Sequence, residues 1–161
     1  MKRELRGIVF KTTNLFAMIR NLVPSDIDQL RLLAELARSE GFHFLDRFVS
    51  EVQTNSLTLD SPGEFFLAFV MRNEIVGIGG VTPDPYVDEP RTGRLRHVYV
   101  RSDHRRGSVG RQLVRELEMR AQPIYATLRL RTDTVAAARF YEALGYDPIV
   151  DPTATHVRRG E

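Results

Sequence analysis

Apolar residues recur three or four positions apart in four segments of the chain, a spacing that places them on one face of a helix. We therefore predict four helices, over residues 25–39, 44–52, 108–121 and 135–144. Ser25 is the expected N-cap of the first helix, because its hydroxyl can accept a hydrogen bond from a free N–H of the first turn. Gly145 follows the last helix, where a C-terminal cap favours a left-handed backbone.

Shorter apolar or alternating runs separate these helices and predict β-strands. They cover residues 16–22, 64–70, 75–81, 95–100 and 124–130, with a final hairpin over 146–150 and 155–158. The link 71–74 is short enough for a hairpin, which joins antiparallel strands. Strands gathered around one strand–loop–helix unit predict an α+β fold with a mostly antiparallel sheet.

The length of 161 residues suits a single domain. Residues 1–15 show no clear periodicity, so we treat them as an N-terminal extension of a domain over 16–161. No run of about 18 apolar residues is present, and the N-terminus lacks the apolar stretch of a signal peptide. These features favour a cytoplasmic protein without a membrane partner.

The chain contains no cysteine and four histidines. The absence of cysteine excludes disulfides, thiolate metal sites and a cysteine nucleophile. The histidines do not have the spacing of metal ligands. We therefore expect no metal.

Residues 97–111 join a strand to a helix through a basic loop. The first N–H groups of a helix have no internal partner, and the helix dipole adds partial positive charge there, so small residues at such an end let phosphate bind. The small residues are Gly107, Ser108 and Gly110, and the basic ones are Arg105, Arg106 and Arg111. The loop is neither a Walker loop nor a dinucleotide fingerprint. A solvated arginine cluster at a helix start is the structural alternative.

Charge is unevenly distributed along a chain whose formal net charge is only +2. Residues 91–131 contain eleven arginines and three acids, whereas the remainder is acidic overall. A local basic patch on a nearly neutral protein favours a compact anionic ligand. Nucleic acid is the competing ligand, but the sequence has no recognisable recognition helix or aromatic RNA platform. We therefore expect no nucleic-acid partner.

Two separated motifs resemble those of the GNAT superfamily of N-acetyltransferases. The family's phosphate loop reads Arg/Gln-x-x-Gly-x-Gly/Ala after an apolar-aromatic-Val strand end, and here Val98-Tyr99-Val100 is followed by Arg105-x-x-Ser108-x-Gly110. The family's later Asn-x-x-Ala-x-x-Phe-Tyr-x-x-x-Gly-Phe/Tyr corresponds to Thr134-x-x-Ala137-x-x-Phe140-Tyr141-x-x-x-Gly145-Tyr146. Ser108 and Thr134 depart from the family's pattern. The resemblance covers residues 16 to the end.

The resemblance implies a mixed, mostly antiparallel sheet of six to seven strands flanked by about four helices. It implies acetyl-CoA as co-substrate, with the pantetheine arm paired to a strand that splays from its neighbour at a bulge. A backbone N–H near Val98 is then expected to polarise the thioester. The residues assigned to acetyl-CoA are Val98, Tyr99, Val100, Arg105, Arg106, Gly107, Ser108, Val109, Gly110, Arg111, Thr134, Ala137, Phe140 and Tyr141.

The implied reaction is direct acetyl transfer to a primary amine of a small molecule or peptide. Tyr141 is the candidate general acid for the departing thiolate, because a phenol keeps its proton over the neutral range; packing in the core is its alternative role. Many family members carry Glu at the position of Arg94, which cannot accept a proton. The base candidates are Glu89 and His97, with Asp88 or ordered water as alternatives, and His156 is a further candidate for the substrate site.

Residues 25–54 and 82–91 are expected to line the acceptor pocket, and the acids of the second segment favour a cationic amine. The alternative function is a catalytically weak regulatory protein that binds acyl-CoA, since position 94 lacks the family's Glu. Family members often form homodimers, and the sequence leaves that partner open.

Overall fold

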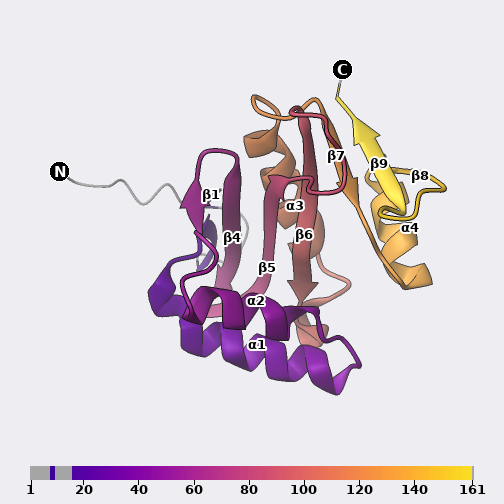
Figure 1. Ribbon diagram of the computed structural model, residues 1–161. Coiled ribbons are helices and arrows are strands. Elements are labelled where there is room, and N and C mark those ends of the chain that lie inside the picture. Colours follow the sequence, from indigo (N-terminus) through magenta and orange to yellow (C-terminus); the bar gives the residue numbers. More distant parts are fainter. Residues whose placement is uncertain (1–7, 10–15, 161) are drawn as a thin grey trace.

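The computed structural model describes residues 8–9 and 16–160, and Figure 1 shows their arrangement. Their four α-helices are α1 (Ile27–Ser39), α2 (Phe44–Gln53), α3 (Val109–Ala121) and α4 (Val135–Ala143). Two short 3-10 helices, η1 (Pro24–Asp26) and η2 (Ser102–His104), precede α1 and α3. All four predicted helices are confirmed, with ends that differ by at most two residues. Within this part of the chain, no helix has the length and apolar character that a membrane span needs.

The described residues form a nine-stranded sheet in the order β1-β2-β4-β5-β6-β7-β9-β8, with β3 paired to β4. The strands are β1 (Ile8–Val9), β2 (Ala17–Asn21), β3 (Asp60–Ser61), β4 (Glu64–Met71), β5 (Glu74–Pro83), β6 (Thr92–Val100), β7 (Thr127–Leu130), β8 (Asp147–Pro148) and β9 (His156–Arg159). Only β6 and β7 pair in parallel. The mostly antiparallel α+β fold is confirmed; the sequence pattern does not predict β1 or β3, which have two residues each.

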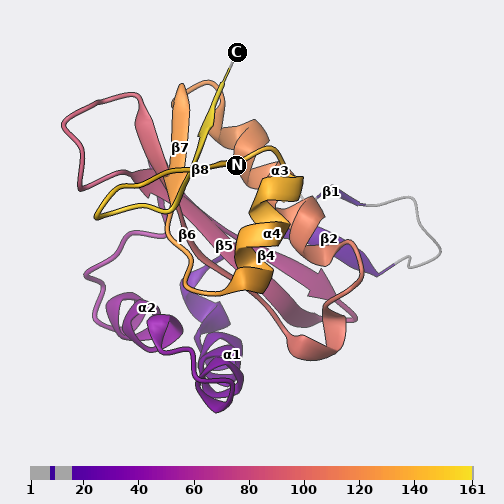
Figure 2. The same ribbon diagram turned by 90° about the vertical axis from the view of Figure 1, so that its right-hand side faces the viewer.

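Helices α1 and α2 cover one face of the sheet, and α3 and α4 cover the other (Figure 2). Strand β4 lies between these two layers. Its Phe66 and Ala68 pack with α1 and α2. Its Leu67 and Phe69 pack with α3 on the other face. A strand that is buried on both faces has a continuous apolar run, which explains the sequence of β4.

The N-cap of α1 is Asp26 and not Ser25, so the predicted N-cap is wrong. Asp26 occupies the N-cap position, although its side chain makes no capping bond to the helix. Its buried carboxylate accepts hydrogen bonds from the Val23 N–H (2.9 Å) and from the Arg20 guanidinium (2.8 and 2.9 Å). A charge-assisted pair with Arg20 is stronger than a hydroxyl cap, so a contact to a preceding strand decides where the helix starts.

Helix α4 ends as predicted. Gly145 has a φ of 97°. The N–H groups of Gly145 and Tyr146 donate to the carbonyls of Glu142 and Tyr141, at 3.1 Å each. This cap closes the last turn and directs Tyr146 into the core, where it is 2% exposed.

Candidate active site

Strands β6 and β7 form a fork in the sheet (Figure 1). They pair at only three positions, where residues 92–94 lie beside residues 127–129, and then separate. From Leu95 onward, the edge of β6 that faces β7 has no strand partner among the described residues. Its backbone N–H and C=O groups are therefore available to an extended ligand.

A β-bulge in β6 lies where the fork opens. The register between β5 and β6 slips, so that His97 and Val98 lie opposite Gly79 alone. His97 adopts a φ of 58°, in the left-handed region that residues with a side chain rarely adopt. A bulge bends a strand and increases its twist, which carries β6 away from β7. The splayed strand and the bulge that the family resemblance implies are both present.

The bulge lies against a close contact between β5 and α3. A Cβ on Gly79 would lie 2.8 Å from Leu117 Cδ1 and 3.2 Å from Val98 Cγ2. Helix α3 therefore approaches the backbone of β5 more closely than a side chain at this position would allow. This approach explains a glycine in the middle of a buried strand.

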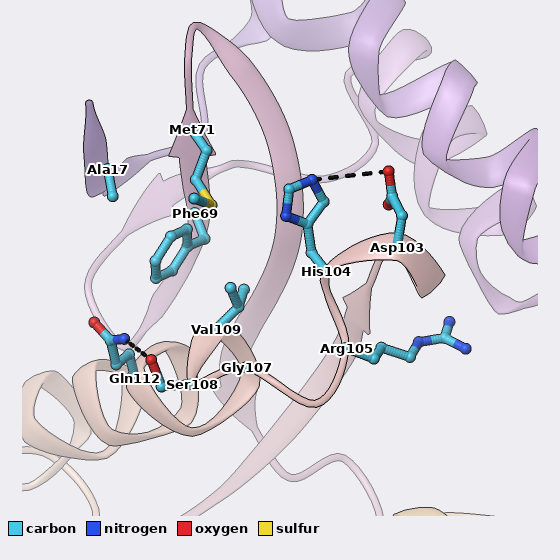
Figure 3. A pocket seen from close by; sticks show the side chains of 10 residues that line it. All are labelled: Ala17, Phe69, Met71, Asp103, His104, Arg105, Gly107, Ser108, Val109 and Gln112. Carbon is cyan, nitrogen blue, oxygen red and sulfur yellow. Dashed lines mark hydrogen bonds and ion pairs between the residues drawn. The ribbon is translucent and has the colours of Figure 1, made fainter. Parts of the chain in front are cut away.

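The loop after β6 leads into α3, which begins at Val109. A hydrogen bond from the Gln112 N–H to the Ser108 carbonyl (2.9 Å) closes the first turn. The N–H groups of Val109, Gly110 and Arg111 therefore have no partner within the helix. The Ser108 hydroxyl accepts from the Gln112 side chain and does not cap them (Figure 3). The helix start is thus open to an anion.

The two glycines of this loop lie in different surroundings. A Cβ on Gly107 would meet only the His104 carbonyl oxygen, 3.9 Å away, so Gly107 borders open space. A Cβ on Gly110 would lie 3.3 Å from Phe140 Cζ and 3.6 Å from Val100 Cγ2. Gly110 therefore lets α4 pack against the start of α3, next to the end of β6.

The three arginines of the loop differ in their partners. Arg105 donates two hydrogen bonds to the Glu40 carboxylate (2.5 and 2.9 Å) and one to the Val100 carbonyl (2.8 Å). Arg106 and Arg111 are exposed, and neither forms an ion pair with another residue in the described ranges. Free positive charge at the helix start therefore comes from Arg106 and Arg111, whereas Arg105 holds the loop in place.

A cavity of about 330 Å³ lies beside this loop (Figure 3). Gly107, Ser108 and Val109 form one side, while Phe69 and Met71 of β4 form the other. Because β4 and β7 lie on opposite sides of the β5–β6 pair, this cavity borders the loop away from the fork. The start of α3 is therefore accessible from the side that faces β4.

Helix α4 carries the candidate acid, Tyr141. The Thr134 hydroxyl accepts from the Ala137 N–H (3.1 Å) and caps the helix, so Thr serves at the family's Asn position. The Tyr141 ring contacts Phe140 and Tyr146 at centroid distances of 5.0 and 5.5 Å. Its hydroxyl has no hydrogen-bond partner in residues 16–160. Burial raises the pKa of Tyr141, so the phenol keeps its proton at neutral pH.

His97 lies on the opposite face of the sheet from Tyr141. Its ring stacks on Phe48 of α2, with a centroid distance of 4.6 Å. Burial, and then the positive charges of Arg96 and Arg47, lower the pKa of His97 from 6.5 to about 4. The imidazole is therefore neutral at pH 7 and is a weak base.

The other proton acceptors considered from the sequence lie away from the bulge. Asp88 and Glu89 are exposed in the loop between β5 and β6, and Glu89 accepts a hydrogen bond from the Arg91 N–H (3.4 Å). His156 is buried on the other face, with its Nε2 3.8 Å from Glu142 of α4. Of the candidates, His97 is the one that the fold places at the opening of the fork.

Arg94, which stands where many family members carry Glu, belongs to a buried charge network that sequence reasoning missed. Asp84 accepts from both Arg94 (3.4 Å) and Arg129 (3.1 Å). Arg129 also binds Asp151 (2.9 Å), and Arg94 donates to the Thr153 carbonyl (2.8 Å). Burial lowers the pKa of Arg94, and the Asp84 charge opposes that shift. The network joins the loop after β8 to the closed end of the fork, where β6 and β7 are still paired. No local sequence pattern indicates these contacts.

Comparison with known proteins agrees with this geometry. The sequence profile of the acetyltransferase (GNAT) family matches residues 29–146, a segment that includes the fork, the loop and α4. Among curated proteins, no match is found. Among solved structures, a protein from Exiguobacterium sp. 255-15 is 26% identical, over 89% of this chain and 93% of its own, with a TM-score of 0.77.

Two further solved structures share the fold at lower identity. An acetyltransferase from Thermus thermophilus is 20% identical over 92% of this chain and 99% of its own, with a TM-score of 0.71. The PaiA N-acetyltransferase from Thermoplasma acidophilum, solved in complex with coenzyme A, is 15% identical over 90% and 99%, with a TM-score of 0.68.

Proposed function

This chain belongs to the GNAT acetyltransferase family, and we propose that it transfers the acetyl group of acetyl-CoA directly to a primary amine of a small molecule or peptide. The fork carries this proposal, because an open strand edge runs straight into a helix start with free N–H groups. An extended arm that ends in a pyrophosphate needs both features in succession. We assign the transferase to residues 16–161; the proposed extension, residues 1–15, lies outside the described residues apart from β1.

In this proposal the pyrophosphate of acetyl-CoA binds at the start of α3. The N–H groups of Val109, Gly110 and Arg111 have no helical partner, and the side chains of Arg106 and Arg111 add charge. Gly107 and Ser108 are exposed, so a phosphate meets little steric obstruction there.

The pantetheine arm lies along the open edge of β6, where it pairs with Val98, Tyr99 and Val100 like an added strand. Phe140 supports this arrangement, because its ring lies against Gly110, which also lies beside Val100 at the end of the strand. Ala137 is one turn before Phe140 and extends this apolar wall. Thr134 contributes through its cap, which orders the start of α4.

Acetyl transfer then needs one oxyanion site and one proton donor. The acceptor nitrogen attacks the thioester carbon, a C–N bond forms, and the Val98 N–H at the bulge stabilises the developing oxyanion. The C–S bond breaks, and the CoA thiolate takes the proton of the Tyr141 hydroxyl, which burial keeps protonated. The amine releases one proton, which restores Tyr141 through solvent. No enzyme group becomes acetylated.

Proton removal from the amine has two candidate routes. His97 is neutral and lies at the bulge, so it can accept a proton from an acceptor on the α2 face, directly or through ordered water. Glu89 is the second candidate, because its carboxylate is exposed in the loop between β5 and β6. The low pKa of His97 favours a relay through water over a strong general base.

An acceptor screen with detection of the free CoA thiol tests the proposed function. Thiol release that depends on a primary amine, with the acetylated amine identified by mass, is the expected result. Tight CoA binding without thiol release from any amine would instead favour the second candidate, a regulatory protein that binds acyl-CoA. The observation behind that second candidate is Arg94, which stands where relatives often carry a carboxylate.

A further inference from the structure

Arg96 emerges from β6 on the face of the sheet that α1 and α2 cover. It pairs with Gly80 of β5, and paired residues of antiparallel strands share a face. A Cβ on Gly80 would lie 2.2 Å from the ring of Phe66, which belongs to the apolar cluster under α1 and α2. Arg96 therefore lies beside Phe66, directly before the bulge and on the same face as His97.

Three acids on the elements around this region already have basic partners. Glu40 binds Arg105 through both carboxylate oxygens. Glu51 of α2 binds Arg47 (2.9 Å). Asp84 is shared by the two arginines of the buried network at the closed end of the fork. We expected the acids of residues 82–91 to attract a cationic amine. The buried acid of that segment, Asp84, is already paired with two arginines.

Arg96 differs from these arginines because it has no counterion. It is half-buried, and no hydrogen bond or ion pair joins it to another residue of the described part of the chain. Its charge nevertheless acts at the fork, where it helps to lower the pKa of His97. A half-buried guanidinium without an anion is unfavourable. Its planar arrangement of N–H donors matches the two oxygens of a carboxylate.

We propose that the acceptor carries a carboxylate as well as its amine, and that Arg96 binds this carboxylate at the opening of the fork. This inference rests on the proposed function and names its substrate class. Arg96 is two positions before Val98, about 7 Å along an extended strand, and an arginine side chain is long enough to span such a distance. Amino acids and short peptides carry both groups within such a range. A polyamine has no anionic group for Arg96.

Matched acceptors test this inference directly. Amino acids and their carboxamides carry the amine on the same α-carbon, but only the acids carry the charge that Arg96 would bind. We expect kcat/KM to be roughly 10- to 100-fold higher for the acids, as is typical for a hydrogen-bonded ion pair. Equal values within each pair would overturn the inference while leaving acetyl transfer intact.

Variants of Arg96 separate recognition from a structural role. Arg96→Gln should raise KM for the preferred amino acid by roughly 10- to 100-fold, with KM for acetyl-CoA unchanged and a much smaller effect on the carboxamide. Arg96→Lys should recover part of the loss, because lysine keeps the positive charge but lacks the planar pair of donors of a guanidinium. Arg159→Gln, at an exposed arginine of β9, is the matched control. Equal loss with the acid and the carboxamide would contradict a role in carboxylate binding.

Calorimetric titration of the CoA-bound protein gives a readout that needs no turnover. N-acetylglycine and N-acetylglycinamide are the probes, since they differ at the carboxylate alone. Tighter binding of the acid, lost in Arg96→Gln, would support the inference even if no amine were acetylated. Equal binding of the two probes, no binding of either, or binding that Arg96→Gln does not weaken would overturn it.

Discussion

The Glu40 carboxylate binds both terminal nitrogens of the Arg105 guanidinium, at 2.5 and 2.9 Å, across 65 positions of the chain. Glu40 also accepts a hydrogen bond from the Tyr99 hydroxyl (2.6 Å). An acid at the C-terminal end of α1 is unfavourable for the helix dipole, so these partners offset that cost. The hydrogen bonds from Arg105 lower the pKa of Glu40. The end of α1, on the expected acceptor side, is thereby attached to the loop where acetyl-CoA is proposed to bind.

Glu40→Gln should loosen the loop without removing the groups that bind phosphate. We expect KM for acetyl-CoA to rise about 3- to 10-fold with kcat nearly unchanged, because a partly exposed ion pair contributes only modestly. Steady-state kinetics with varied acetyl-CoA measure the change. Glu35→Gln, at an exposed acid of the same helix, is the control. An unaltered KM would mean that the contact does not order the loop.

Tyr141→Phe should lower kcat by a factor of about 10² or more, because it removes the proposed proton donor and leaves the ring in place. Tyr146→Phe is a matched control. The Tyr146 hydroxyl is buried and has no hydrogen-bond partner in residues 16–160, so its removal should leave activity unchanged and stability equal or higher. The comparison is made from kcat values measured at saturating acetyl-CoA. Wild-type turnover by Tyr141→Phe would show that Tyr141 only packs in the core.

Arg106→Gln and Arg111→Gln should each weaken acetyl-CoA binding. These exposed arginines lack ion-pair partners among the described residues, so their charge acts on the proposed pyrophosphate. We expect KM to rise about 3- to 10-fold for each variant and the difference from wild type to shrink at high salt. Arg159→Gln again serves as control, and a salt-independent effect would argue against electrostatic binding.

His97 should make the free energy of unfolding depend on pH, because its pKa differs between the folded and the unfolded protein. The folded protein lowers the pKa from 6.5 to about 4. The unfolded chain then binds more protons than the folded protein in this range. The contribution of neutral His97 to the free energy of unfolding is therefore complete above pH 6.5, and roughly 3 kcal/mol of it is lost as the pH decreases to 4. His97→Asn, which tolerates the left-handed backbone, should flatten this slope in urea unfolding measured at several pH values. A slope in His97→Asn as steep as in the wild type would contradict this assignment.

Asp84→Asn should destabilise the closed end of the fork. The substitution leaves Arg94 and Arg129 buried without the carboxylate that they share, and breaking a buried ion pair on one side typically costs about 3–5 kcal/mol. Urea unfolding and the melting temperature report the loss. Asp88→Asn, in the exposed part of the same loop, should change either quantity little, and equal effects of the two variants would refute the network's role in stability.

Local pattern is sufficient to predict most elements of this protein. Helical spacing places α1 to α4 within two residues, and alternating or continuous apolar runs indicate the longer strands. The loop from Arg105 to Gly110 and the Phe140-Tyr141 motif also stand out, because free helix N–H groups, small residues and turn signals act over a few neighbouring positions. These features are enough to indicate the family and the region where an anion binds.

Contacts between residues that are far apart in the sequence could be identified only from the folded structure. Nothing near Arg105 indicates that Glu40 engages it, and nothing near Arg94 indicates Asp84 and Arg129, because these partners meet through packing and strand order. The bulge matters most for function. A single extra residue in a strand changes which face each later side chain occupies, so the placement of His97 beside Phe48 depends on the register between β5 and β6. Register is a property of the whole sheet, and local sequence does not encode it alone.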